Sequence, residues 1–132
     1  MIVYQQEKEF SPEELERLFL SVDWESGRYP EKLARALANY TCVWSAREDG
    51  RLVGLIAALD DGVMTAYIHY VLVDPAVQGK GIGRELTRRV LEVYQEYLRV
   101  FLVADRAELA GFYGPFGFRL NDVKKPMYLE RF

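Results

Sequence analysis

A glycine-rich turn between an apolar strand and an amphipathic helix is the part of this sequence best suited to chemistry. The turn covers residues 78–84 and holds three glycines together with Lys80 and Arg84. A helix start leaves backbone N–H groups unpaired and carries a partial positive charge, so a turn with few side chains can bring several donors onto a pyrophosphate. The two basic side chains would add to the attraction. The sequence therefore predicts that this turn binds phosphate groups.

Two other glycine-rich phosphate motifs do not fit the turn. The dinucleotide motif G-x-G-x-x-G would need glycine where Arg84 stands if it began at Gly79, and where Leu86 stands if it began at Gly81. The Walker A motif lacks its first glycine here and has no Ser or Thr after Lys80. Neither nucleotide-binding motif is therefore present.

The composition and the first residues predict one folded domain, residues 1–132, that begins with two helices. Half of the residues are hydrophobic and 28% are charged, which is typical of a soluble globular chain. Ser11, Pro12 and Glu14 form a helix start, with a capping residue, a first-turn proline and a glutamate three positions on. Pro30 precedes a second run of apolar residues at helical spacing.

After residue 40 the sequence predicts mainly strands, together with one long helix. The runs 41–47, 52–59 and 67–73 are rich in β-forming residues and are separated by turn sequences, so they predict three antiparallel strands. An apolar stripe predicts a helix over 82–97, and a buried strand over 100–104 follows, parallel to the strand before the helix. Four shorter elements complete the prediction: an opening strand at 2–4, a short helix at 107–113, and closing strands at 118–120 and 127–129.

The glycine-rich turn and a later aromatic segment together resemble the GCN5-related N-acetyltransferase (GNAT) superfamily. Residues 78–83 match its acetyl-CoA signature, Q/R-x-x-G-x-G/A, and residues 71–75 supply the preceding V-x-V-D-P. Residues 110–118 resemble its F-Y-x-x-x-G-F segment. The resemblance implies an α+β (mixed α/β) fold, with a twisted, mostly antiparallel sheet of six or seven strands, flanking helices, and a parallel strand–helix–strand unit for acetyl-CoA. It also implies acetyl-CoA as cosubstrate and N-acetylation of a primary amine.

The same resemblance assigns residues to the coenzyme. The strand backbone at Leu72 and Val73 would pair with the pantetheine arm, and the gap between this strand and residues 100–104 would admit the thioester. Asp105 falls where relatives often place a polar coenzyme contact, although it would equally suit a helix cap. The predicted coenzyme-binding set is Val71, Leu72, Val73, Gln78, Gly79, Lys80, Gly81, Ile82, Gly83, Arg84, Asp105 and Phe112.

Acyl transfer to an amine needs a proton acceptor for the amine and a proton donor for the departing thiolate. The resemblance places Tyr113 on the tyrosine that commonly protonates the coenzyme sulfur; the alternative is a packing role in an aromatic cluster. His69 stands near a position where many relatives carry Glu, and its imidazole suits a base. A structural, hydrogen-bonded His69 and a catalytic Tyr70 are the alternatives. Strand alternation predicts that His69 shares a face with Tyr67 and Val71, opposite Tyr70.

The acceptor is less defined. In the superfamily the acceptor site lies across the splayed strands from the coenzyme, lined by the first two helices and the closing loop, and this nominates Trp24, Tyr29 and Trp44 as walls. The segment 100–117 looks most like small bacterial relatives of the plant serotonin-type arylalkylamine enzymes, while a polyamine, an aminosugar or a peptide amino group stay as alternatives. An acyl-CoA sensor without turnover is an alternative of another class. Acidic residues that could attract an amine are Asp23, Glu25 and Asp60.

Composition and charge limit which classes of binding partner are expected. The net charge of −3 gives no field for a polyanion, so no nucleic acid partner is expected. The apolar runs are short and no leader pattern follows Met1, so no membrane partner and a cytoplasmic location are expected. With one cysteine, Cys42, and one histidine, neither a disulfide nor a metal site is expected, and Cys42 is interpreted as a small buried residue. The resemblance leaves a homodimer open.

Overall fold

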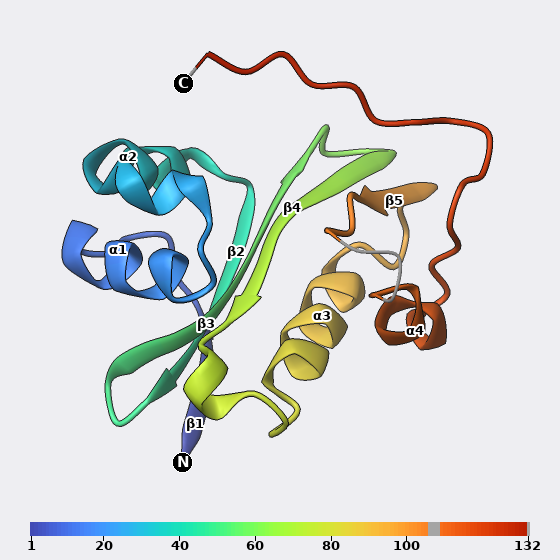
Figure 1. Cartoon of the computed structure of the whole chain (residues 1–132). Helices are drawn as coiled ribbons and strands as arrows, with labels where there is room; N and C mark the ends of the chain where they lie inside the picture. Colours follow the sequence, from blue (N-terminus) through green and yellow to red (C-terminus); the bar gives the residue numbers. More distant parts are fainter. Residues whose placement is uncertain (106–108, 132) are drawn as a thin grey trace.

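Five strands form one mixed sheet at the centre of the fold (Figure 1). The computed structural model describes residues 1–105 and 109–131, and in that part the strand order is β1-β2-β3-β4-β5. The first four strands pair antiparallel, whereas β4 and β5 pair parallel. The mixed α+β fold, the antiparallel middle strands and the parallel strand–helix–strand unit are thus confirmed. The bounds are β1 Ile2–Gln6, β2 Cys42–Glu48, β3 Arg51–Asp60, β4 Thr65–Val73 and β5 Arg99–Leu102.

The predicted count of six or seven strands is not confirmed. In the part of the chain that the structure describes, residues 118–120 and 127–129 form no strand. Their β-forming composition is a local signal, but a strand also needs a partner edge to supply its hydrogen bonds. After the short helix η4 (Gly114–Phe116) the chain runs extended around the outside of the sheet instead (Figure 1).

Helices cover both faces of the sheet. On one face lie α1 (Pro12–Ser21), the short 3₁₀ helix η1 (Glu25–Arg28) and α2 (Pro30–Asn39); on the other lies α3 (Ile82–Val93), which ends before the predicted residue 97 (Figure 1). The predicted start of α1 is confirmed as a capping box, because Ser11 and Glu14 exchange backbone-to-side-chain hydrogen bonds. Further short helices are η2 Pro75–Val77, α4 Ala110–Tyr113 and η4 Gly114–Phe116. Residue 107, where the sequence predicts the start of α4, lies outside the described residues.

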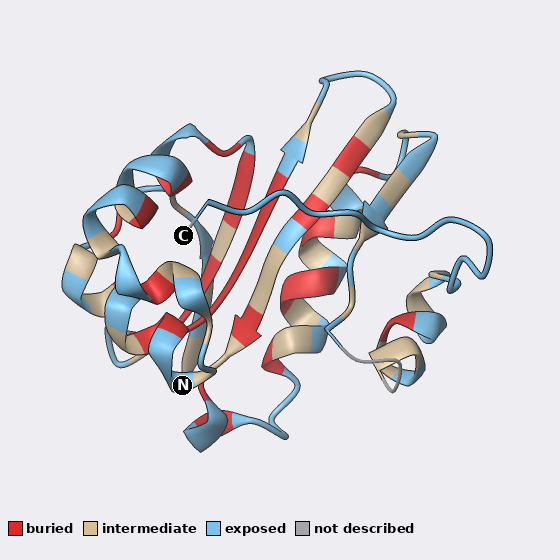
Figure 2. Ribbon diagram, turned by 45° about the horizontal axis from the view of Figure 1, so that its top comes forward, coloured by how far each residue is buried: buried red, intermediate tan, exposed pale blue. Residues whose placement is uncertain are grey.

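Two apolar clusters hold these layers together. Side chains from α1 and α2, among them Leu15, Phe19 and Leu37, pack on one face of the sheet. The stripe of α3 packs on the other face through residues such as Leu86 and Val90. The buried residues therefore follow the middle of β3 and the inner side of α3 (Figure 2).

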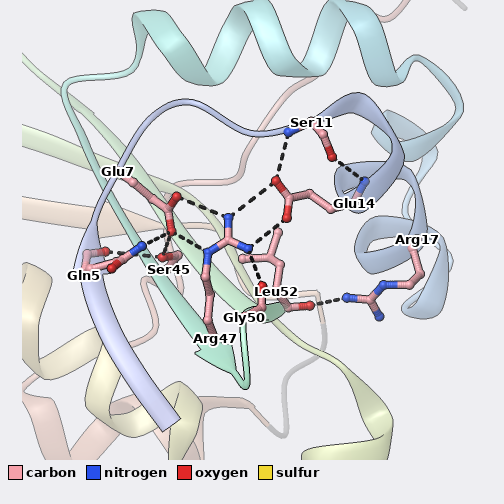
Figure 3. Close-up of polar contacts among 9 residues, drawn as sticks. All are labelled: Gln5, Glu7, Ser11, Glu14, Arg17, Ser45, Arg47, Gly50 and Leu52. Atoms are coloured by element: carbon pink, nitrogen blue, oxygen red, sulfur yellow. Dashed lines mark hydrogen bonds and ion pairs between the residues drawn. The ribbon is translucent and has the colours of Figure 1, made fainter.

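A half-buried guanidinium fixes the chain before α1 to the sheet. Arg47 on β2 binds the carboxylates of Glu7 and Glu14, each at 2.9 Å, and donates to the carbonyl of Gly50 (Figure 3). Burial alone would raise the pKa of Glu7, but the hydrogen bonds from Arg47 and Ser45 outweigh it and hold that pKa below its ordinary value. This cluster ties the segment between β1 and α1 to β2.

A β-bulge in β4 changes which side chains share a face. Ala57 of β3 lies opposite Tyr70, but its neighbour Ala58 lies opposite Ile68, so His69 is an extra residue in β4. His69 and Tyr70 consequently lie on the same face, with ring centroids 4.1 Å apart. The prediction that His69 shares a face with Val71 and opposes Tyr70 is therefore wrong, because an inserted residue reverses the alternation.

Candidate functional site

A cavity of about 700 Å³ opens between the end of β4, the start of α3 and α4. It exists because β5 leaves β4: the last paired residues are Ile68 and Leu102, while β4 continues to Val73. The predicted gap between these two strands is thus present. In the described part of the chain, the edge of β4 beyond Ile68 faces this cavity rather than another strand.

The glycine-rich turn forms one wall of the cavity. Gly79 and Gly81 have φ values of +87° and +80°, and a Cβ atom added to either would meet no atom within 4 Å. Glycine adopts this left-handed backbone at little cost, and its missing side chain leaves the amides accessible. The Gln78 side chain closes the turn by donating to the carbonyl of Val73 at 3.1 Å. Bare backbone at the start of a long helix is the arrangement that binds phosphate groups.

An ion pair with a buried carboxylate holds the turn in place. Asp74, the first residue after β4, accepts from the amide of Ala76 and from Arg17 of α1, both at 2.9 Å. Arg17 also donates to the carbonyl of Leu52 on β3 (Figure 3). The hydrogen bond from Ala76, aided by Arg17, holds the pKa of Asp74 below its ordinary value despite burial. This pair was not predicted from the sequence, because its partners are far apart in the chain.

A second unpredicted residue, Gly54 of β3, lets α3 approach the sheet. A Cβ atom at this position would lie 3.0 Å from Cγ2 of Ile82 and 3.3 Å from Cδ1 of Leu86. These distances are tighter than ordinary van der Waals contact. Glycine at position 54 therefore sets how closely the first turns of α3, and with them the wall of the cavity, lie against β3.

The structure brings nearly all of the predicted coenzyme residues together. Lys80 is the exception: its Nζ atom lies 3.9 Å from Glu48, and it does not line the cavity. Val22 and Trp24, which follow α1, complete the opposite wall, and no local pattern in the sequence marks Val22 as a lining residue. The lining residues are Val22, Trp24, Val71, Leu72, Val73, Gln78, Gly79, Gly81, Ile82, Gly83, Arg84, Asp105, Leu109, Phe112 and Tyr113.

Tyr113 lies in the wall of the cavity and is itself almost fully buried. Its ring packs edge-on against Phe112 and Phe118. Burial, together with the charge of Asp105, raises the pKa of the Tyr113 phenol above 10.0. The hydroxyl therefore keeps its proton at neutral pH and can serve as a donor.

His69 does not line this cavity and lies on the face of the sheet that carries α1 and α2. Its Nδ1 atom is 2.5 Å from the hydroxyl of Tyr40, and its ring stacks on Tyr67 and Tyr70. The ring is exposed at the surface, but its neighbours remove part of its hydration, and this lowers the pKa below the ordinary 6.5. His69 is therefore mostly neutral at pH 7.

A smaller groove of about 350 Å³ lies on that same face, between η1, α2 and β4. Tyr29 and Tyr70 are its aromatic lining residues, and Lys32 and Arg131 are its basic ones. Tyr70 also packs against Trp24 at 5.9 Å between ring centroids. Because Trp24 lines the large cavity, the rings of Trp24 and Tyr70 separate the large cavity from the smaller groove.

The other predicted acceptor residues lie elsewhere. Trp44 packs on the α3 side, under the guanidinium of Arg89. Asp60 accepts hydrogen bonds from the hydroxyls of Tyr94 and Tyr97. Cys42 is buried, as interpreted, and burial raises the pKa of its thiol.

Two negative findings concern the described residues only. None of their helices combines the length and apolarity that a membrane span requires. Their His, Cys, Asp and Glu side chains form no group of three or more that is suited to a metal ion.

Comparison with known proteins identifies the family. Residues 7–118 match the profile of the Acetyltransferase (GNAT) family. The chain therefore belongs to the GNAT family of acetyltransferases. A GNAT-family acetyltransferase from Streptococcus pneumoniae has the same fold, with a TM-score of 0.84 and 26% identity over 99% of both chains. A proposed acetyltransferase from Deinococcus radiodurans gives a TM-score of 0.82 and 30% identity over 98% of this chain and 88% of that one.

Two plant proteins are the curated relatives to note. Serotonin N-acetyltransferase 2 of Oryza sativa is 31% identical over 99 residues, which cover 71% of this chain and 50% of that protein. A histone acetyltransferase of Glycine max is 31% identical over 121 residues, which cover 82% of this chain and 52% of that protein. The chain thus spans about half the length of these curated relatives.

Proposed function

We propose that the protein transfers the acetyl group of acetyl-CoA to a primary amine in a ternary complex. The observation that carries the proposal is the cavity itself, because it joins three features: the bare glycine-rich turn, the unpaired edge of β4 beyond Ile68, and Tyr113. The turn fits a pyrophosphate, and free strand-edge groups fit the amide groups of a pantetheine arm. The family and the solved structures support the same coenzyme.

In the proposed reaction, each proton that moves has a donor and an acceptor. The amine nitrogen bonds to the acetyl carbon and the C–S bond breaks. The base takes the proton from the amine, and Tyr113 gives its proton to the sulfur and regains one from solvent. A backbone N–H near Leu72 or Val73 would stabilise the oxyanion.

His69 is the proposed base, acting directly or through water, with Tyr70 as the alternative. If Nδ1–H donates to the Tyr40 hydroxyl, Nε2 is left as a proton acceptor, and the lowered pKa keeps the ring neutral at pH 7. His69 also stacks on Tyr70, whose ring lines the smaller groove and packs against Trp24 of the large cavity. This position supports a role on the acceptor side rather than at the coenzyme.

The smaller groove is the proposed acceptor site, and its lining favours an amine with an aromatic body. Tyr29 and Tyr70 supply aromatic side chains, whereas Lys32 and Arg131 would repel a polycation. The name of the Oryza relative, a serotonin N-acetyltransferase, agrees with this chemistry. A polyamine is the acceptor that this lining disfavours most.

A panel assay tests the proposal. The release of free thiol from acetyl-CoA would be measured with aromatic monoamines, aromatic amino acids, polyamines, aminosugars and a peptide amine, next to calorimetric titration with coenzyme A. We expect coenzyme binding, and thiol release that is fastest with aromatic monoamines. Coenzyme binding without turnover on the whole panel would favour the sensor alternative, and no saturable binding would overturn the proposal.

A further inference from the structure

His69 lines neither the large cavity nor the smaller groove, so as a base it needs a path for the proton of the amine. Its Nδ1 atom is 2.5 Å from the hydroxyl of Tyr40, a buried residue that follows α2. The two rings are nearly parallel, with centroids 6.0 Å apart. Lys8 fixes the backbone of Tyr40 by donating to its carbonyl at 3.0 Å. Tyr40 is therefore held in place, and it holds one nitrogen of His69.

A second hydrogen bond lies at the smaller groove. The hydroxyl of Tyr70 is 2.8 Å from Oγ of Ser26, and both residues line that groove. Tyr70 also stacks on Tyr40, with ring centroids 6.0 Å apart. Burial is the main cause that raises the pKa of Tyr40, and the phenol of Tyr70 adds to it through its charge and a side-chain hydrogen bond. Three hydroxyls thus lead from the groove to Nδ1 of His69.

The chemistry of these groups sets the direction of the hydrogen bonds. A phenol has one proton to donate, and a neutral imidazole has one bare nitrogen that accepts. That nitrogen accepts a proton more readily than a phenol oxygen does, so Tyr40 donates to Nδ1 of His69, and the Tyr40 oxygen can accept from Tyr70. In this tautomer Nε2 carries the ring proton, whereas direct proton uptake by Nε2 would need the other tautomer.

We propose that Tyr70 and Tyr40 form a proton relay from the acceptor amine in the smaller groove to Nδ1 of His69. The inference rests on the amine acetylation proposed above. As the amine attacks the acetyl carbon, its N–H bond breaks and the proton bonds to the Tyr70 oxygen. The Tyr70 proton passes to Tyr40 and the Tyr40 proton to Nδ1, so both phenols stay neutral and His69 becomes an imidazolium. The exposed imidazolium then loses a proton to solvent, and exchange of the ring protons with rotation of the hydroxyls restores the starting state.

The groups around the relay favour a proton that leaves the groove. Among the described residues, those in titratable contact with His69 are phenols, and the charged groups at the relay and its groove are cations. The phenols are Tyr40, Tyr67 and Tyr70, and the cations are Lys8, Lys32 and Arg131. The two cations that line the groove disfavour a protonated amine there. The amine proton is therefore more stable on the exposed imidazole than in the groove.

Nitrogen-15 NMR of the imidazole tests the direction of the relay. His69 is the only histidine, so the imidazole signals report on it alone. At a pH above its pKa, we expect Nδ1 to be the bare nitrogen and Nε2 to carry the proton. A ring with its proton on Nδ1 would overturn the relay, because Tyr40 would then accept rather than donate. The measurement uses no substrate, so it tests the relay apart from the acetylation reaction.

The Tyr40→Phe variant tests the relay in turnover. It keeps the ring and removes the hydroxyl, so with the best amine of the panel we expect kcat to fall by at least about tenfold, with coenzyme affinity unchanged. The acid limb of kcat/KM that belongs to His69 should disappear, although NMR still shows the ring titrating. Tyr67→Phe is the matched control, because Tyr67 stacks on His69 but its hydroxyl is outside the proposed chain. It should retain the wild-type kcat.

A double-mutant cycle distinguishes one path from two separate contributions. Tyr40→Phe and Tyr70→Phe interrupt the same chain, so the double variant should match the slower single variant in kcat to within about twofold. Losses that multiply would contradict the relay, as would a His69 acid limb that persists in Tyr40→Phe while wild-type turnover is normal. A wild type without turnover on any amine would instead remove the acetylation proposal, and the relay with it.

Discussion

Arg17 of α1 donates a hydrogen bond of 2.9 Å to the Oδ2 atom of Asp74, the residue that follows β4. Asp74 also accepts from the amide of Ala76 at the start of the glycine-rich connection. One carboxylate thus joins the helix that precedes Trp24 to the turn on the other side of the cavity. Loosening this pair should therefore affect stability and coenzyme affinity together.

The Asp74→Asn variant tests this link. The amide keeps an acceptor for Ala76 but loses the charge opposite Arg17, so we expect a loss of about 1–3 kcal/mol of unfolding free energy and weaker binding of coenzyme A. Thermal denaturation and calorimetric titration measure the two effects. Asp122→Asn, in the exposed connection after η4, is the control and should change neither.

The same carboxylate predicts a pH dependence of stability. The pKa of Asp74 is lowered in the folded protein, so its contribution is complete above the ordinary value of 3.8 and is lost as the pH falls through the lower, folded value. The stability difference between wild type and Asp74→Asn should be constant near neutral pH and shrink in acid. A difference that instead grew in acid would contradict the lowered pKa.

Local signals explain how much of the fold and site could be predicted. The capping box at Ser11 and the glycine-rich turn at the start of α3 depend on neighbouring residues, and both were predicted. The bulge at His69 depends on the register between β3 and β4, and the closeness that Gly54 permits depends on how α3 packs. Neither property can be read from a short stretch of sequence. The rule of strand alternation therefore put His69 on the wrong face of the sheet, and nothing in the sequence indicated that Gly54 lets α3 approach.

The strand predicted at residues 127–129 shows a different limit. Its composition satisfies the local requirement for a strand, but the pairing edge must come from elsewhere in the structure. Composition therefore predicts where a strand could form but cannot supply the edge that it must pair with.

Gly81→Ala separates phosphate binding from backbone strain. Gly81 and Gly50 share a positive φ and open surroundings, so alanine at either should cost about 1–2 kcal/mol of stability. Only Gly81 lies in the cavity wall, so only Gly81→Ala should also weaken coenzyme A binding, by about tenfold to a hundredfold. Equal coenzyme affinity in Gly81→Ala and Gly50→Ala would argue against a phosphate site at this turn.

Gly54→Ala tests the close approach of α3. A strand alanine reduces the entropy of the unfolded chain, a gain of about 0.4–1 kcal/mol, but the crowding against Ile82 and Leu86 costs about 1–3 kcal/mol. We expect a net loss of stability, measured by chemical denaturation. Gly111→Ala, in α4, meets no atom within 4 Å and should be neutral or slightly stabilising. A stabilised Gly54→Ala variant would show that α3 can shift freely.

Tyr113→Phe tests the proposed acid. We expect kcat to fall by about a hundredfold with little change in coenzyme affinity, because the ring and its packing are kept. Since the pKa of Tyr113 is raised, the wild type should lose activity through this group only above pH 10. Tyr4→Phe, on β1 and outside the cavity, is the control. Full turnover in Tyr113→Phe at all pH values would remove Tyr113 from the chemistry.

His69→Gln tests the proposed base through a pH profile of kcat/KM. A base must be neutral to accept a proton, and the pKa of His69 is lowered, so the wild-type activity should decline in acid through a value below 6.5. The variant should lose this acid limb and be at least about tenfold slower near pH 7. Coenzyme affinity should not change, because His69 does not line the large cavity proposed for the coenzyme. An acid limb that survives in His69→Gln would assign the base elsewhere, and Tyr70→Phe would then be the next variant, since Tyr70 lines the smaller groove.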